Sequence, residues 1–320
     1  MSTGADLSVR NDYDGPWKEI LEIYFEECMA FFFPDVHRDI DWTKGYEFLD
    51  KELQQIVREA EVGKRIADKL VKVWTSDSEQ IWIVVHIEVQ SQSEQSFAER
   101  MYVYNYRLRD LFSRPVASFV ILSDSSKRWR PYRFTAEQWG TTVAFEFRTA
   151  KLLDYKQQWE ELLADKNPFS VVVMAHLKTL ETSNDRVSRK RWKLRLIKLL
   201  YQRGYSRKDV IQLLRFIDWL LALPSALEAD LWQEILAYQE ETKMPYVTSL
   251  ERLAEDRGRE EGLAEGLRRG IKIALRLKFG EAGLRLVPEI ESISDVEILT
   301  NLETGLEGAL SLEELRQLYR

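Results

Sequence analysis

A run of apolar residues that changes into an alternating pattern lies at residues 80–92, which read QIWIVVHIEVQSQ. Residues 81–85 are all β-branched or aromatic, and such a continuous run is typical of a strand covered on both faces in a parallel or mixed sheet. The second half alternates, so His86, Glu88 and Gln90 face one side of the sheet and the apolar residues between them face the other. The pattern predicts a central strand with polar residues on one face near its end.

A carboxylate on a buried strand needs compensation, because an unpaired buried charge costs several kcal/mol or shifts its pKa until it is neutral. The alternative is a strand end that emerges into solvent, where Glu88 and Gln90 are hydrated. A preceding strand at residues 67–74 begins near Asp68, and Lys72 falls on the same face by the period of two. Two neighbouring strands that each offer a carboxylate near one end can hold a divalent cation between them.

The rest of the first half alternates helical and extended patterns. Apolar residues at helical spacing predict a helix at residues 17–33 that ends at Pro34. Residues 46–57 are ambiguous between helix and strand, and we favour a strand.

Residues 97–112 predict a helix with an apolar face. Its other side carries Arg100, Arg107 and Arg109, which could clamp phosphate or be solvated. Residues 116–122 predict a second buried strand, so the helix is a crossover in a mixed α/β sheet. Residues 141–148 predict an edge strand.

Two basic segments are candidates for nucleic-acid contact. Residues 127–133, KRWRPYR, mix cations with aromatics and include Lys127, Arg128 and Arg130. Residues 186–208 hold ten Lys or Arg and no acid, and the candidates there for contact with a DNA backbone are Arg189, Lys190, Arg191 and Lys193. The alternatives are a solvated turn for the first segment and, for the second, a helix face whose charges pair with acids elsewhere.

From residue 151 onward the periodicity is helical. His176 lies in an apolar helix at residues 170–182, which indicates a packed core histidine and not a ligand. Gly258, Gly262, Gly266 and Gly270 form a small-residue stripe that runs through the charged segment 250–269 to the residue after it. The stripe fits close helix packing or a subunit contact, so a homodimer stays open. In the last segment, Ser311 and Glu314 fit a capping box. We therefore divide the chain into residues 1–150, 151–250, 251–270 and 271–320.

Composition narrows the class without selecting a function. The 320 residues carry a formal net charge of −7, with 45% hydrophobic and 31% charged residues, as expected of a globular protein. No apolar run approaches the roughly 20 residues of a membrane helix, and the N-terminus lacks an apolar signal core, so we expect no membrane partner and a cytoplasmic location. The single cysteine, Cys28, excludes an intrachain disulfide and is expected to be buried. The acidic balance argues against non-specific coating of nucleic acid but allows a local basic groove.

Over roughly residues 12–150 the chain resembles the PD-(D/E)XK phosphodiesterase superfamily. The resemblance is carried by Asp68, about twenty residues, then Glu88-Val89-Gln90-Ser91 on an apolar strand, and then a helix with Arg100, Tyr102, Tyr104 and Tyr106. The Glu-x-Gln-Ser sequence is similar to the recombination-promoting nuclease and putative transposase branch. The resemblance implies a restriction-endonuclease-like mixed sheet flanked by helices, followed here by an α-helical C-terminal half. It further implies a metal-dependent DNA endonuclease that acts in DNA recombination or mobile-element processing.

The same resemblance assigns roles to individual residues. Asp68, Glu88 and the carbonyl of Val89 are expected to bind Mg²⁺, or Mn²⁺ in its place. Gln90 stands where a lysine usually orients the attacking water, and glutamine supplies no cation. Lys72 is the first candidate for that charge and Arg100 the second, although Lys72 could instead extend into solvent. The competing hypothesis is a nuclease fold without catalysis, retained for DNA binding or protein interaction.

Overall fold

The computed structural model describes residues 14–49, 68–76, 82–242, 247–291, 293, 295–308 and 311–319. The chain divides into two compact units, Met1–Tyr238 and Gln239–Arg320. Within the described residues no helix is both long and apolar enough to cross a membrane.

The first unit begins with three helices, α1 (Asp14–Ile23), α2 (Phe25–Phe32) and α3 (Pro34–Asp39). The prediction of one helix over residues 17–33 is wrong, because the chain leaves helical geometry at Tyr24, whose φ is −125°. The Tyr24 hydroxyl donates to Asp209 at 2.8 Å, a contact far along the chain that no local pattern signals. Pro34 follows the end of α2 and is also the first residue of α3, because proline suits the first turn of a helix.

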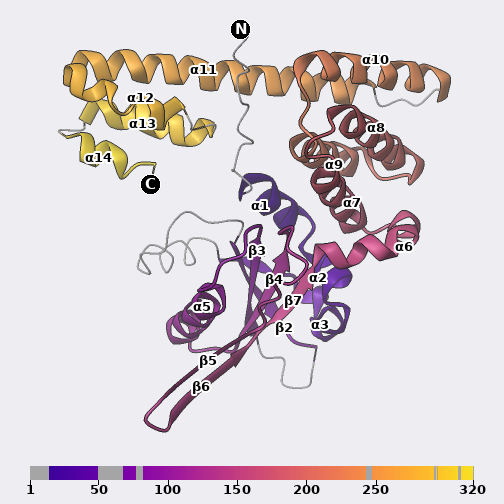
Figure 1. The fold of residues 1–320 in the computed structure, drawn as a ribbon, viewed down its shortest axis with the longest axis vertical. Coiled ribbons are helices and arrows are strands. Elements are labelled where there is room, and N and C mark those ends of the chain that lie inside the picture. The colour runs from indigo at the N-terminus through magenta and orange to yellow at the C-terminus, as the bar shows by residue number, and fades with distance from the viewer. Residues whose placement is uncertain are drawn as a thin grey trace. The chain divides into compact units, whose positions relative to one another are not determined.

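A five-stranded sheet forms the centre of this unit, in the order β1 (Glu47–Phe48), β2 (Asp68–Trp74), β3 (Trp82–Gln90), β4 (Val116–Leu122) and β7 (Arg148–Lys151). Strand β2 runs antiparallel to both of its neighbours, β1 and β3, whereas β3, β4 and β7 run parallel to one another. Helix α5 (Phe97–Phe112) connects the parallel strands β3 and β4 (Figure 1). The predicted mixed α/β class is confirmed, as are the strands at residues 82–90 and 116–122 and the crossover helix. The strand predicted at residues 46–57 is present at Glu47–Phe48, and residues 50–57 lie outside the described part.

The strand predicted at residues 141–148 is present at Thr141–Glu146, but it is not the edge of the central sheet. Strands β5 (Arg133–Gln138) and β6 (Thr141–Glu146) form a separate two-stranded hairpin that projects from the sheet, and the sheet edge is β7 (Figure 1). Trp139 and Gly140 at its tip have φ of 51° and 82°, the left-handed pair that tight hairpin turns require. After β7 the helical part of the chain begins with the 3-10 helix η2 (Leu152–Gln158), one residue later than predicted.

The two faces of the sheet are covered by different helices. On one face α5 contributes Phe97, Met101, Tyr104 and Leu108, all fully buried, to the packing against β2 and β4. The opposite face is covered by the N-terminal helices, with the Phe33 and Phe119 rings 4.7 Å apart. Because the sheet is covered on both faces, a charged side chain in its middle is removed from water.

Helices complete the first unit: α6 (Trp159–Ala164), α7 (Pro168–Glu181), α8 (Arg186–Gln202), α9 (Arg207–Leu220) and α10 (Ser225–Thr242), whose last residues enter the second unit. The basic stretch 186–208 thus spans α8 and the start of α9, and the turn between them contains Gly204 with a φ of 70°. The predicted core position of His176 on α7 is confirmed, since 3% of the residue is exposed.

The second unit contains α11 (Val247–Leu284), α12 (Val287–Glu291), α13 (Val296–Gly308) and α14 (Leu312–Arg316). Helix α11 runs through residues 250 and 270, at which the sequence predicts boundaries. Its buried residues, among them Ile271 and Leu275, pack against Leu299 and Leu302 of α13. Ser311 caps α14 as predicted by accepting from the Glu314 amide. The subunit contact suggested by the glycine stripe stays a prediction.

Candidate functional site

The two carboxylates of the predicted site belong to residues that face each other across the sheet. In the antiparallel register of β2 and β3, Asp68 is the direct partner of Glu88. Directly opposite residues in such a pair lie on the same face, with Cα atoms about 4.5–5.5 Å apart. The start of β2 and the end of β3 therefore bring both residues to one edge of the sheet, on the face that α5 covers. The side chain of Asp68 lies outside the described part.

Glu88 is fully buried, and an arginine bonds to it. The Arg100 Nη2 donates to Glu88 Oε1 at 2.7 Å and to Gln90 Oε1 at 2.9 Å, and Nη1 pairs with Glu94. Only 7% of Arg100 is exposed, and its guanidinium lies 4.8 Å from the Phe97 ring centroid. Placing Arg100 on the solvated side of its helix is therefore wrong. The helical period already contains the signal, because Arg100 lies three residues after Phe97 and four before Tyr104, on the buried stripe.

His86 is a fully buried neighbour of Glu88 on the same strand face. Its Nε2 is 3.8 Å from Glu88 Oε2, and its ring meets the Tyr104 ring edge-on at 5.7 Å. Within the described part of the chain neither ring nitrogen has a hydrogen-bond partner. Burial lowers the pKa of His86 to about 4, and the positive charge of Arg100 contributes to this lowering. The imidazole is therefore neutral at pH 7.

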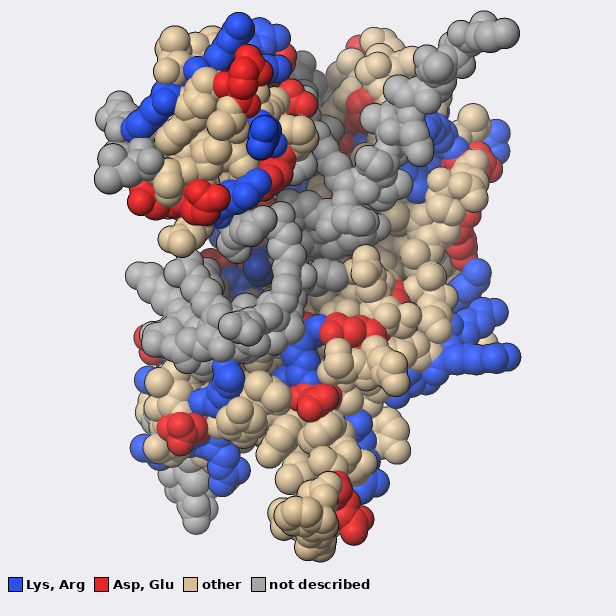
Figure 2. Space-filling model, turned by 60° about the vertical axis from the view of Figure 1, so that its left-hand side comes forward, with Lys and Arg blue, Asp and Glu red and all other residues tan. Residues whose placement is uncertain are grey.

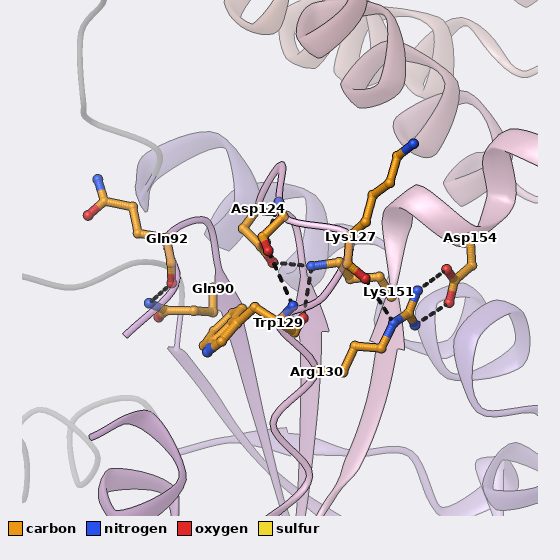
Figure 3. A network of polar contacts seen from close by, with 9 residues as sticks. Gln90, Gln92, Asp124, Lys127, Trp129, Arg130, Lys151 and Asp154 are labelled. Atoms are coloured by element: carbon orange, nitrogen blue, oxygen red, sulfur yellow. Dashed lines mark hydrogen bonds and ion pairs between the residues drawn. The ribbon is translucent and has the colours of Figure 1, made fainter. Parts of the chain in front are cut away.

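Gln90 ends the strand next to this group. Its Nε2 donates to the Gln92 carbonyl at 2.7 Å (Figure 3). Its Oε1 accepts from Arg100, so the carboxamide is held at both ends. Val89 lies between Glu88 and Gln90 with its side chain buried on the opposite face. The carbonyl role assigned to Val89 stays a prediction.

Lys72 occupies a different part of the sheet from these residues. It stands opposite Val84 and Glu47 in the register, four residues from Asp68. Its Nζ is 3.5 Å from Glu47 Oε2 and 5.6 Å from the Trp74 ring centroid. The structure brings Arg100, the second candidate, into contact with Glu88 and Gln90, and places Lys72 against Glu47.

The neighbouring strand ends add polar groups that the sequence reasoning missed. Lys151 ends β7 in line with Gln90 and Leu122 across the three parallel strands. It forms a buried ion pair with Asp124, and its Nζ donates to the Trp129 carbonyl at 3.2 Å (Figure 3). No periodicity identifies Lys151, because β7 is only four residues long and leads directly into a helical segment. The edge formed by the ends of β3, β4 and β7 is therefore more polar than predicted.

The basic segment 127–133 forms the loop above this edge. Lys127 and Arg128 are exposed, whereas Arg130 is held by Asp154 at 2.5 and 2.7 Å (Figure 3). This ion pair raises the pKa of Arg130 and lowers that of Asp154. Two of the three cations proposed for DNA contact here point to solvent and the third pairs within the chain.

The basic cluster of α8 is divided in the same way. Lys193 is buried and pairs with Asp218 at 2.5 Å and Glu228 at 2.9 Å. Lys190 pairs with Asp230 and Glu234. For these two lysines the alternative of charges paired to acids elsewhere is what the structure shows.

The two arginines of the cluster differ from each other. Arg189 donates to Thr182 Oγ1 and to the Thr179 carbonyl, both at 3.3 Å, whereas Arg191 is exposed. On the face drawn in Figure 2, basic and acidic side chains lie close together over much of the described surface.

The chain matches no protein-family model, no curated protein and no solved structure. Among the described residues no group of three or more His, Cys, Asp or Glu side chains is arranged to hold a metal ion, and the Asp68 side chain is not among those residues. The resemblance to the PD-(D/E)XK superfamily accordingly stays a prediction.

Proposed function

We propose that this chain is a metal-dependent DNA endonuclease of the PD-(D/E)XK type, which hydrolyses phosphodiester bonds. The observation that supports this most is the register that sets Asp68 directly opposite Glu88, with Gln90 two residues further on the same face. A fully buried glutamate at a strand end is a costly arrangement for a purely structural sheet. Such clusters of perturbed polar groups are typical of functional sites.

The residues at this edge fit a divalent cation. Asp68, Glu88 and the Val89 carbonyl would hold Mg²⁺ or Mn²⁺. Beside Glu88, the buried imidazole of His86 has no hydrogen-bond partner among the described residues, so its nitrogens are further polar groups at this site. When bound, the ion supplies Lewis-acid charge to the scissile phosphate and lowers the pKa of an attacking water.

The chain's own side chains complete the chemistry. Arg100 provides a fixed positive charge next to Glu88, in a setting where water is excluded and electrostatic stabilisation is strong. Gln90, anchored by Arg100 and by the Gln92 carbonyl, positions a water or a phosphate oxygen by hydrogen bonding. In this arrangement the lost lysine charge is supplied by Arg100.

A second candidate function has its own supporting observation. The guanidinium of Arg100 already compensates Glu88, so the fold needs no metal to be stable. A nuclease fold retained for DNA binding or protein interaction would have this property.

Cleavage of supercoiled plasmid with Mg²⁺, Mn²⁺, Ca²⁺ or a chelator distinguishes the two functions. We expect nicking with Mg²⁺ or Mn²⁺ that is abolished in Asp68→Asn and Glu88→Gln. Glu94→Gln is the matched control, since Glu94 bonds the same arginine but is half-exposed and lies outside the strand. It should retain cleavage. Cleavage by Glu88→Gln at the wild-type rate would show that Glu88 is not catalytic. No metal-dependent cleavage by the wild type would overturn the nuclease assignment in favour of the non-catalytic one.

A further inference from the structure

Among the described residues, His86 has a buried imidazole with both ring nitrogens unbonded, and the packing described so far does not explain its burial. A buried polar group without a hydrogen bond costs about 1–3 kcal/mol, and both ring nitrogens of His86 are in this condition within the described part of the chain. The ring contributes an edge-on contact with Tyr104, which fixes its orientation. An apolar residue of similar size would fill the same space without that cost.

The position of His86 in the register places it beside both carboxylates. It lies two residues before Glu88 on one strand face, and its cross-strand partner is Leu70, two residues after Asp68. Asp68 and His86 are thus diagonal neighbours in the register of the two strands. Glu88 is at the corner between them.

The two carboxylate oxygens of Glu88 have different neighbours. Arg100 donates to Oε1, whereas Oε2 lies 3.8 Å from the His86 Nε2. Two donor atoms bound to one ion at about 2.1 Å each are about 3.0 Å apart at a right angle and about 4.2 Å apart on opposite sides. The observed separation falls within this interval, so one ion can contact both atoms while Arg100 stays on the other oxygen.

We propose that His86 is a metal ligand, and that Asp68, His86 and Glu88 form a mixed nitrogen and oxygen site that prefers transition-type divalent cations such as Mn²⁺ over Mg²⁺. The proposal rests on the proposed function, to which it adds a ligand and a metal class. Mg²⁺ favours oxygen ligands and retains its waters, whereas imidazole nitrogen suits transition metals. An all-oxygen site would show little such discrimination.

Pulsed electron paramagnetic resonance on the full chain with Mn²⁺ tests the proposal without reference to activity. We expect modulation from a directly bound ¹⁴N nucleus in the wild type, and its replacement by the ¹⁵N pattern after labelling with ¹⁵N-histidine. His86→Leu should remove the signal and weaken Mn²⁺ binding by about 10-fold or more, with a smaller effect on Mg²⁺. The wild-type spectrum decides the question even where His86→Leu folds poorly.

The chain has three histidines, so the other two provide complete controls. His176→Leu removes another buried imidazole, and His37→Gln removes the half-buried ring that lies 3.7 Å from Glu26. Both should keep the nitrogen signal. If Mn²⁺ binds without a nitrogen signal, or His86→Leu binds it as tightly as the wild type, the His86 assignment is wrong and the carboxylate site stands. If the wild type binds neither Mn²⁺ nor Mg²⁺, the proposed nuclease function fails along with it.

Discussion

At the scale of single residues, the buried charge of Glu88 determines the arrangement around it. The sequence shows that a carboxylate in an apolar strand needs a partner, and proposes a metal ion. In the structure the partner is a guanidinium, which also fixes Gln90 and Glu94 through its remaining donors. Arginine suits this position because its planar fork can bond several oxygens at once.

Substitution of Arg100 measures how Glu88 depends on that guanidinium. Arg100→Met leaves a buried carboxylate without it, so the free energy of unfolding should fall by about 3–5 kcal/mol. Mn²⁺ or Mg²⁺ then has more charge to compensate, so it should raise the melting temperature of the variant more than that of the wild type. Denaturation with and without each ion measures both effects.

Lys72→Met is the matched control for Arg100→Met, since it removes a cation from the same sheet. Lys72 pairs with a mostly exposed Glu47, and such pairs contribute up to about 1 kcal/mol to stability. Because Lys72 lies against Glu47 and not against Glu88, cleavage should change by less than about fivefold. A loss of cleavage near 10²-fold, the size expected for a transition-state donor, would return the role to Lys72.

At the scale of elements, the sequence predicts what depends on local pattern and fails where distant contacts decide. Strand β3, α5 and β4 are predicted because apolar runs and the helical period are continuous there. The alignment of Asp68 with Glu88 follows from two neighbouring strands, but their register is visible only in the structure. Strands β5 and β7 were not predicted. Strand β5 is almost wholly solvent-exposed and so lacks an apolar alternation, and β7 is only four residues long. The break at Tyr24 coincides with a hydrogen bond to Asp209, 185 residues away, which no local pattern signals.

Helix α7 gives the element-scale prediction, because it carries a buried histidine in the core. Burial lowers the pKa of His176 to about 4, with a further contribution from the positive charge of Lys151, and its ring packs near Trp17 at 6.4 Å. The unfolded chain binds a proton near the ordinary pKa of 6.5, so the neutral folded form is favoured above that pH. The stability contributed by His176 is therefore lost as the pH falls from 6.5 toward 4.

His176→Leu should make the dependence of unfolding free energy on pH shallower across this window, by up to about 1.4 kcal/mol per pH unit. Urea denaturation at several pH values between 4 and 6.5 gives the slope of each protein. The buried His86 keeps its own contribution in both, so the difference isolates His176. Identical slopes in the wild type and the variant would show that His176 is protonated in the folded state.

At the scale of the whole molecule, the net charge of −7 restricts how DNA can be contacted. Counterion release requires exposed cations, and several of the cations in the basic segments are already engaged within the chain. Helix α8 retains three arginines at its surface, Arg186, Arg191 and Arg195. These three, and not the whole basic cluster, are the part of α8 available to a phosphate backbone.

The prediction for DNA binding follows from this division between exposed and paired cations. Replacing the three exposed arginines with glutamine should weaken binding to all sequences alike and reduce the slope of log affinity against log salt by about 2–3, since each phosphate contact contributes about 0.9. Lys193→Gln is the contrasting variant, because its buried ion pairs stabilise the helical layer and do not face DNA. It should lower the melting temperature and leave the salt slope unchanged. Fluorescence anisotropy over a range of salt concentrations measures the slopes. An unaltered slope in the triple arginine variant would show that α8 is a solvated surface. The loop of Lys127 and Arg128 would then be the expected DNA contact.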